Sequence, residues 1–118
     1  MYINKLVPAF GELYLASLPG GENIQSGVRP VLITQNIIAG STAEILPLTS
    51  KLKALHLPTH VVIQPNAANG LSCPSMILAE QVTTINIAAL IKKLGCLQRK
   101  DLIRTGKARQ AQSHFPTE

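Results

Sequence analysis

Arg29 has the most informative setting among the side chains of this sequence that can do polar chemistry. It lies between a polar loop, residues 22–27, and a dense β-branched run, residues 28–36. The stem of this arginine can therefore be fixed by a strand while its guanidinium faces a groove. A guanidinium donates two parallel hydrogen bonds to a phosphate group, which suits phosphodiester chemistry. On this residue alone, a structural arginine that pairs with a carboxylate remains an open alternative.

Histidines are the usual proton-transfer groups near neutral pH, because their ordinary pKa lies there. His56 falls in a predicted loop and His114 in the C-terminal tail, so the histidines do not resemble a two-histidine acid–base pair. His60 falls in a predicted strand. For His60, we favour a place on an edge strand over a catalytic role.

The two cysteines, Cys73 and Cys96, form neither a C-x-x-C pair nor a disulfide framework. The scattered histidines add no zinc-ligand spacing, so we predict no metal site and no cofactor. No segment approaches the ~20 consecutive apolar residues of a membrane-spanning helix. The start of the chain lacks the basic and apolar pattern of a signal peptide. We therefore expect a reduced, cytoplasmic protein that does not bind a membrane.

The composition predicts an aliphatic core and a polyanionic partner. Of the 118 residues, 46% are hydrophobic but only 3% are aromatic, which argues against a nucleic-acid binder built on rows of stacked aromatics. The formal net charge of +5 favours nucleic acid or an acidic protein segment as the partner. A solvated helix face is an equal alternative for the cations of the last third, which are Lys92, Lys93, Arg99, Lys100, Arg104, Lys107 and Arg109.

The first two-thirds of the chain contains short alternating or β-branched runs, which predict strands. Turn residues such as the Pro-Gly-Gly run at 19–21 separate them. The predicted strands span residues 12–18, 28–36, 44–49, 59–64 and 75–85, and one helical turn is expected at 51–55. Such short strands favour a small barrel, because closure removes the exposed edges of an open sheet.

The hydrophobic period changes after residue 85. Asn86 can cap a short helix, residues 87–94, that ends at Gly95. A second helix is predicted over about 98–110, with Leu102 and Ile103 facing inward. We therefore predict a single domain, 1–118, that is mainly β, with a barrel over about 11–85 and a helical C-terminal part over about 86–112.

Several motifs resemble the MazF/PemK-like toxins in order and spacing, from about Gly11 to Cys96. The segment GELYLASLPG is similar to the opening strand of that family, and GVRPVLITQN at 27–36 looks like its G-x-R-P-V-L-x-x-Q-N signature. The segments PLTS at 47–50, LPTHVVI at 57–63 and LAEQVTTI at 78–85 also match. The resemblance implies an SH3-like β-barrel of the CcdB/MazF plasmid-maintenance toxin type, with short C-terminal helices.

The resemblance also implies a function and its residues. It implies a toxin that cleaves single-stranded mRNA at specific sequences without a metal ion, using the 2′-hydroxyl of the substrate as nucleophile. By their positions in the motifs, Arg29 and Thr49 are the expected catalytic residues. The expected RNA-binding residues are Gln25, Ser50, His60 and Gln81. A homodimer and a cognate antitoxin are the implied partners, with operator DNA bound only through the antitoxin.

Some residues depart from the family pattern near the expected groove. The segment from Asn36 to Thr49 is shorter than the usual form, and Thr83, Ala88 and Ala89 replace residues that are often basic or polar. A weakened or inactive copy that only binds antitoxin or RNA is therefore kept as an alternative. A gyrase inhibitor of the CcdB type is less favoured, because that class acts through a C-terminal Trp-Gly-Ile and this chain has no Trp.

Overall fold

The computed structural model describes residues 7–19, 27–37 and 40–112. Within these ranges the chain forms seven antiparallel strands and one C-terminal α-helix, which confirms the predicted mainly β class but with one α-helix rather than two. None of the described helices is long and apolar enough to cross a lipid bilayer. The elements are β1 (Glu12–Leu18), β2 (Gly27–Ile33), β3 (Thr42–Thr49), β4 (His60–Ile63), β5 (Ser75–Leu78), β6 (Thr83–Asn86), η1 (Ile87–Ala89), β7 (Leu90–Cys96) and α1 (Arg99–Gln112).

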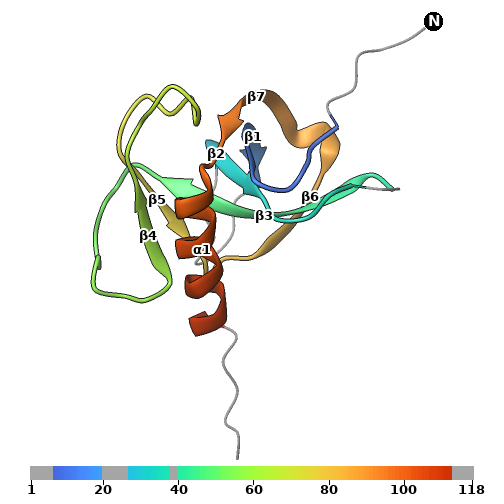
Figure 1. The fold of residues 1–118 in the computed structure, drawn as a ribbon. Helices are drawn as coiled ribbons and strands as arrows, with labels where there is room; N and C mark the ends of the chain where they lie inside the picture. Colours follow the sequence, from blue (N-terminus) through green and yellow to red (C-terminus); the bar gives the residue numbers. More distant parts are fainter. Residues whose placement is uncertain (1–6, 20–26, 38–39, 113–118) are drawn as a thin grey trace, which may run out of the picture.

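The strands are joined in the order β4-β5-β3-β2-β1-β7, and β6 pairs with β3 as well. In Figure 1, α1 lies across the strands, with the β4–β5 pair on one side and β1, β6 and β7 on the other. Strand β3 is central because β2 pairs with one of its edges while β5 and β6 share the other. The strands that carry the expected catalytic residues, β2 and β3, are therefore held by neighbours.

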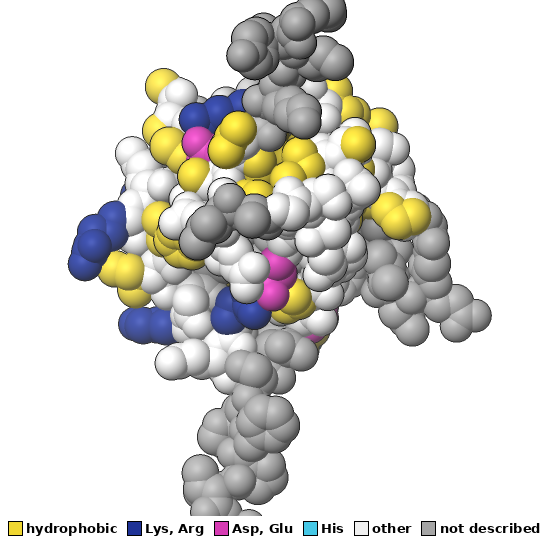
Figure 2. All heavy atoms as spheres, turned by 90° about the vertical axis from the view of Figure 1, so that its right-hand side faces the viewer, with side chains coloured by type: hydrophobic (Ala, Val, Ile, Leu, Met, Phe, Trp, Pro, Cys, Tyr) yellow, Lys and Arg dark blue, Asp and Glu magenta, His cyan; other side chains and the backbone are white. Residues whose placement is uncertain are grey.

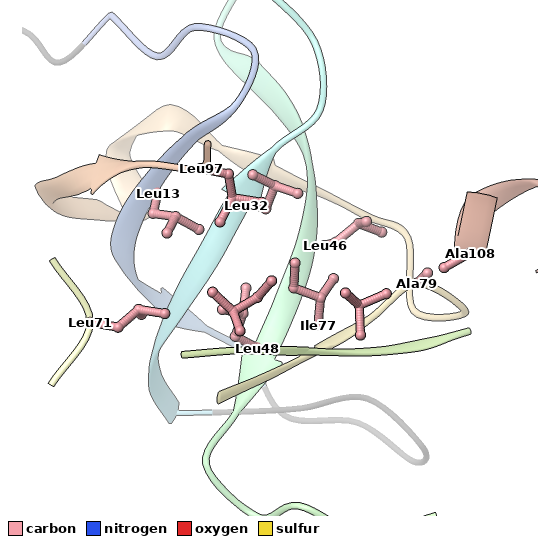
Figure 3. Close-up of a cluster of buried hydrophobic side chains, with 11 residues drawn as sticks. Leu13, Leu32, Leu46, Leu48, Leu71, Ile77, Ala79, Leu97 and Ala108 are labelled. Carbon is pink, nitrogen blue, oxygen red and sulfur yellow. The ribbon is translucent and has the colours of Figure 1, made fainter. Parts of the chain in front are cut away.

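Both faces of the sheet are apolar, because successive side chains of a strand point to opposite faces. On β1, Leu13 belongs to one buried cluster while Tyr14 and Ala16 belong to another. On β3, Leu46 and Ile45 divide in the same way. Side chains of the first cluster converge from several strands in Figure 3. The run of apolar residues in these strands is thus used twice, once for each face.

Helix α1 covers the first cluster. Ala108 is buried in that cluster, and Leu102 packs against it from the first half of the helix. The inward orientation predicted for Ile103 is wrong, since its side chain is 48% exposed. A helix turns by about 100° per residue, so neighbouring positions cannot both face a flat sheet.

The helix predicted over 87–94 is wrong. Asn86 does cap a helical turn, since its side-chain oxygen accepts the Ala88 amide hydrogen, but η1 ends at Ala89. The next residues form β7, which pairs with β1 instead. Gly95 ends no helix: it lets β7 approach the loop before β5, where a Cβ would run into the carbonyl oxygen of Ala68. The helical part therefore begins at Arg99 rather than at about 86.

The single strand predicted over 75–85 is divided into β5 and β6. Both halves pair with β3, but a turn at residues 79–82 shifts the register between them. In that turn the Gln81 amide hydrogen is donated to Leu78 O, and the Ala79 amide hydrogen to Thr59 O. Pro47 stands opposite the interruption and has no amide hydrogen to continue a ladder.

The helical turn predicted at 51–55 is absent, and a non-helical connection leads from β3 to β4. Its Ala54 has a φ of 53°, outside the helical region. The other predicted strands are present with shifted ends, most of all the second, which ends at Ile33 rather than at Asn36.

Candidate active site

A cleft of about 740 Å³ brings together four of the six residues that were expected to act on RNA. These four are Arg29, Thr49, His60 and Gln81, and they come from β2, β3, β4 and the turn between β5 and β6. The other residues that line the cleft are Lys51, Lys53, Ala54, Met76, Leu78 and Glu80.

Strand register explains why residues so far apart in the sequence share one surface. His60 is paired with Leu78, and Thr49 is paired with Met76, so these four residues project from the same face of the sheet. Their neighbours Leu48 and Ile77 project from the other face into the first cluster, which α1 covers. The cleft is therefore on the face of the sheet away from the helix.

Arg29 is half-buried in β2, opposite Ala16 of β1. The pairing of β2 with β3 begins at Val31, which lies opposite Pro47. Continued by two residues, that register sets Arg29 opposite Thr49. Pro30 has no amide hydrogen, so the ladder does not continue through it and the two polar residues lie just beyond the last paired position.

Thr49 is the last residue of β3, and only 5% of it is exposed. Its Oγ1 accepts the amide hydrogen of Lys51 over 3.1 Å. This contact orients the hydroxyl and leaves its own hydrogen able to donate to an incoming oxygen atom. Burial and the local bond thus hold a single polar group at the floor of the cleft.

His60 begins β4, which is the edge strand at one end of the sheet, as expected. Its side chain is 8% exposed and has a contact at each ring nitrogen. Nδ1 lies 3.0 Å from Ala54 O, and Nε2 lies 3.1 Å from Glu80 Oε2. The ring therefore joins two walls of the cleft.

The turn at residues 79–82 carries Glu80 and Gln81 to the cleft. Gln81 is half-buried, and Thr83 Oγ1 donates to Gln81 O over 2.9 Å. Thr83 is one of the departures from the family pattern, and its hydroxyl thus fixes the backbone next to a cleft residue.

Two of the predicted site residues are not placed in the cleft. Ser50 follows Thr49 but is exposed and does not line the cleft. Gln25 lies outside the described residues, as does most of the loop around it. Lys51 and Lys53 line the cleft and were missed, because a helical turn was predicted for their segment. The K-x-K pattern directly after Thr49 was the signal that could have found them.

The cleft carries more positive than negative charge, since Arg29, Lys51 and Lys53 face one carboxylate, Glu80. None of the seven cations of the last third lines it. Lys93, Arg104 and Arg109 instead pair with carboxylates at 2.7, 2.9 and 3.3 Å. On the face that Figure 2 shows, Lys and Arg side chains form separate groups with uncharged surface between them. Clustered cations in a concave site attract a polyanion more strongly than scattered ones.

The described residues contain no group of three or more His, Cys, Asp or Glu side chains that could hold a metal ion. The groups that line the cleft are hydrogen-bond donors and cations together with one hydroxyl and one amide. Such a set can bind a phosphodiester and stabilise negative charge that develops on its oxygens.

Comparisons with known proteins give a consistent result. Residues 9–109 match the family model described as PemK-like, MazF-like toxin of type II toxin–antitoxin system. The endoribonuclease EndoA of Bacillus subtilis is 36% identical over 104 residues, covering 85% of this chain and 89% of the relative. An endoribonuclease MazF of Staphylococcus epidermidis is 34% identical over 102 residues, covering 83% and 84%.

The fold is similar to solved structures at lower sequence identity. MazF of Deinococcus radiodurans superposes with a TM-score of 0.77 at 20% identity, covering 91% of this chain and 96% of that one. The Mycobacterium tuberculosis toxin MazF-mt6 gives a TM-score of 0.72 at 22% identity, covering 89% and 98%. A further match of TM-score 0.72 at 19% identity, covering 95% and 100%, is a MazE–MazF structure from Deinococcus radiodurans.

Proposed function

We propose, from the premise that this chain belongs to the PemK-like, MazF-like toxins of type II toxin–antitoxin systems, that it is a metal-independent endoribonuclease which cuts single-stranded RNA at specific sequences. Relatives named endoribonuclease that are more than 30% identical over most of the chain support the activity. The observation that carries the proposal is the meeting of Arg29, Thr49 and Gln81 in one cationic cleft on the helix-free face of the sheet.

In the proposed reaction, the 2′-hydroxyl of the substrate attacks the adjacent phosphorus. The O2′–P bond forms, the P–O5′ bond breaks, and a 2′,3′-cyclic phosphate and a 5′-hydroxyl result. The 2′-oxygen loses one proton and the 5′-oxygen gains one, so no outside reactant is consumed. The enzyme must stabilise the charge on the phosphoryl oxygens as the bonds exchange.

Arg29 and Thr49 are the proposed catalytic residues. The guanidinium of Arg29 donates to the phosphoryl oxygens, and half-burial in β2 limits its motion. The hydroxyl of Thr49 donates to the scissile phosphate or binds the 2′-hydroxyl, from a position set by its bond to the Lys51 amide. Their opposed positions on β2 and β3 place both groups on one phosphate.

Sequence selection is assigned to polar groups around these two. The amide of Gln81 can donate to and accept from a base edge, as recognition of single-stranded RNA requires. Ser50 at the rim is a proposed RNA contact, and so is Gln25, outside the described residues. His60 is retained among the RNA-binding residues, through the indirect role argued below.

The proposed partners follow from the family and from charge. We propose a homodimer that a cognate antitoxin neutralises by placing an acidic segment in the cationic cleft. Contact with operator DNA would then be made by the antitoxin rather than by this chain. A cytoplasmic location is part of the same proposal, because mRNA is translated there.

The test is incubation of purified protein with a long mixed-sequence RNA in the presence of EDTA, followed by mapping of 5′ ends. We expect discrete cuts that persist in chelator and fall by roughly 100- to 1,000-fold in Arg29→Ala, the usual effect of removing one preorganised donor. Lys107→Ala is the matched control, since it removes one positive charge from an exposed position of α1.

Two outcomes would contradict the proposal. Cuts that disappear in EDTA would exclude a metal-independent reaction, and equal cutting by Arg29→Ala would exclude the role of Arg29. Antitoxin or RNA binding by a folded protein that cuts nothing would instead establish the inactive copy. The shortened segment before Thr49 would then be the first suspect.

A further inference from the structure

The connection between β3 and β4 carries two of the three cations of the cleft. Its residues 51–58, here called the strap, are all exposed. Lys51 and Lys53 nevertheless line the cleft. Exposed segments with few buried contacts open easily, so the position of these lysines depends on specific polar contacts.

The middle of the strap is strained and is held at one atom. Ala54 has a φ of 53°, a conformation that non-glycine residues adopt at a cost of about 1 kcal/mol or more. Its carbonyl oxygen accepts the Leu57 amide hydrogen over 3.1 Å and faces His60 Nδ1 at 3.0 Å. A strained residue persists only where its surroundings hold it, and here the contacts converge on that oxygen.

His60 connects this oxygen to the opposite wall of the cleft. Its Nε2 lies 3.1 Å from Glu80 Oε2, in the turn that also carries Gln81. The ring is almost entirely buried while Glu80 is more open, at 8% and 36% exposure. The strap and the turn are thus joined through one rigid side chain.

Counting hydrogens restricts what His60 can do in this arrangement. A carbonyl oxygen and an ionised carboxylate are both acceptors only. Both contacts are therefore made when each ring nitrogen carries a hydrogen, or when the carboxyl group supplies the second one. In either state, no ring nitrogen is left to take a proton from RNA.

We propose that His60 is a positioning residue: it joins the strap to the turn at 79–82 and thereby holds Lys51 and Lys53 where they bind phosphates that flank the scissile bond. This role rests on the proposed ribonuclease function for its ligand, single-stranded RNA. The lysines supply charge, and His60 supplies their placement. Binding should weaken when the bridge is removed, although both lysines remain.

The test measures binding of an RNA oligonucleotide that contains a mapped cut sequence with a 2′-deoxy residue at the cut, over a range of salt concentrations. Each phosphate contact that is lost lowers the slope of log K against log salt by about 0.7 for a single strand. We expect His60→Ala to lower the slope as the Lys51→Ala/Lys53→Ala pair does. Added to that pair, His60→Ala should have no further effect, and kcat at saturating RNA should stay the same.

A further loss of slope in the triple variant would overturn the proposal, because His60 would then contact phosphate directly. A fall in kcat at saturating RNA with an unchanged slope would also overturn it, since His60 would then act in catalysis. His56→Ala is the matched control, because His56 is an exposed histidine of the same strap that does not line the cleft. Its slope should equal that of the unmodified protein.

Glu80→Ala tests the other end of the bridge at an exposed position, where folding should be unaffected. Charge alone predicts tighter RNA binding, because a carboxylate leaves a cationic cleft. The bridge predicts a lower slope and weaker binding, and a slope that is unchanged or higher would contradict it.

The bridge can also be judged without RNA, which separates its failure from failure of the proposed function. Amide relaxation of residues 51–57 should show added motion in His60→Ala and none in His56→Ala. Unchanged order in His60→Ala would overturn the positioning role, even if the protein cuts RNA.

Discussion

The two faces of the sheet differ in how they are stabilised, and adjacent residues of β3 show the difference. Leu48 is fully buried in the first cluster beneath α1, while Thr49 lies at the floor of the cleft with one polar contact. The helix-covered face is formed by many apolar side chains from most strands (Figure 3). The cleft face depends on a few polar groups, each held by one or two bonds.

The comparison teaches that stability and chemistry are divided between the faces. On the covered face, each side chain contributes through buried area, and residues of similar size can replace it. On the cleft face, a side chain contributes through the position of one atom. Substitutions on the first face should therefore change the free energy of unfolding, and substitutions on the second should change cleavage.

The largest effect on stability is expected from Leu48→Ala. This change removes a fully buried side chain from the first cluster and should lower the free energy of unfolding by about 2–5 kcal/mol. Urea denaturation measures it, and Leu48→Met should lower the same quantity by less than about 1.5 kcal/mol. Unchanged stability with lost cleavage would contradict the division between the faces.

Thr49→Val should have the opposite profile. Valine keeps the shape and β-propensity of threonine but removes the hydroxyl, so a hydrogen bond to the charged phosphate is lost. We expect cleavage to fall by roughly 10- to 100-fold, since such bonds are worth about 1.5–3 kcal/mol. Thr49→Ser retains the hydroxyl and should remain active in the same end-mapping assay. Equal activity of the valine and serine variants would remove Thr49 from the reaction.

A smaller effect that depends on pH is expected where β1 meets β7, away from the cleft. Glu12 bonds Lys93 Nζ at 2.7 Å and also accepts from the Ala9 amide and the Tyr14 hydroxyl. Burial alone would raise the pKa of Glu12, but the bonds from Lys93 and Ala9 outweigh it and hold the pKa below 4.5.

The stabilisation by Glu12 should therefore be fully present above pH 4.5 and be lost as the pH falls through the lower folded-state pKa. Thermal unfolding of Glu12→Gln and of the unmodified protein from neutral to acid pH measures it. Their difference should vanish in acid, and RNA cleavage at neutral pH should not change. A difference that persists when Glu12 is protonated would assign it to packing instead.

The smallest effect is expected from Ile103→Ser. The side chain of Ile103 is 48% exposed on α1, so the free energy of unfolding should change by no more than about 0.5 kcal/mol. Leu102→Ala should cost clearly more, because Leu102 packs against the first cluster. Equal losses in the two variants would mean that the helix contacts the sheet differently.

Local patterns predicted much of the molecule. The alternation of β1 identified its two faces, and the cap at Asn86 was predicted from its side chain. The motifs identified Arg29, Thr49, His60 and Gln81 as site residues, and all four line one cleft. The strap was misjudged, because Lys51, Leu52 and Lys53 are good helix formers and no sequence pattern marks the turn at Ala54.

By itself, the sequence determined the mainly β class, the family and the polar residues of the site, because each depends on local residue types and spacing. Only the tertiary structure decided that residues 90–96 form a strand, that the strand predicted over 75–85 is divided, and that His60 faces Glu80. These features depend on pairing partners distant in the chain. The same Leu-Ile-Lys-Lys run suits a helix in isolation, but here the free edge of β1 offers it hydrogen bonds and burial as a strand.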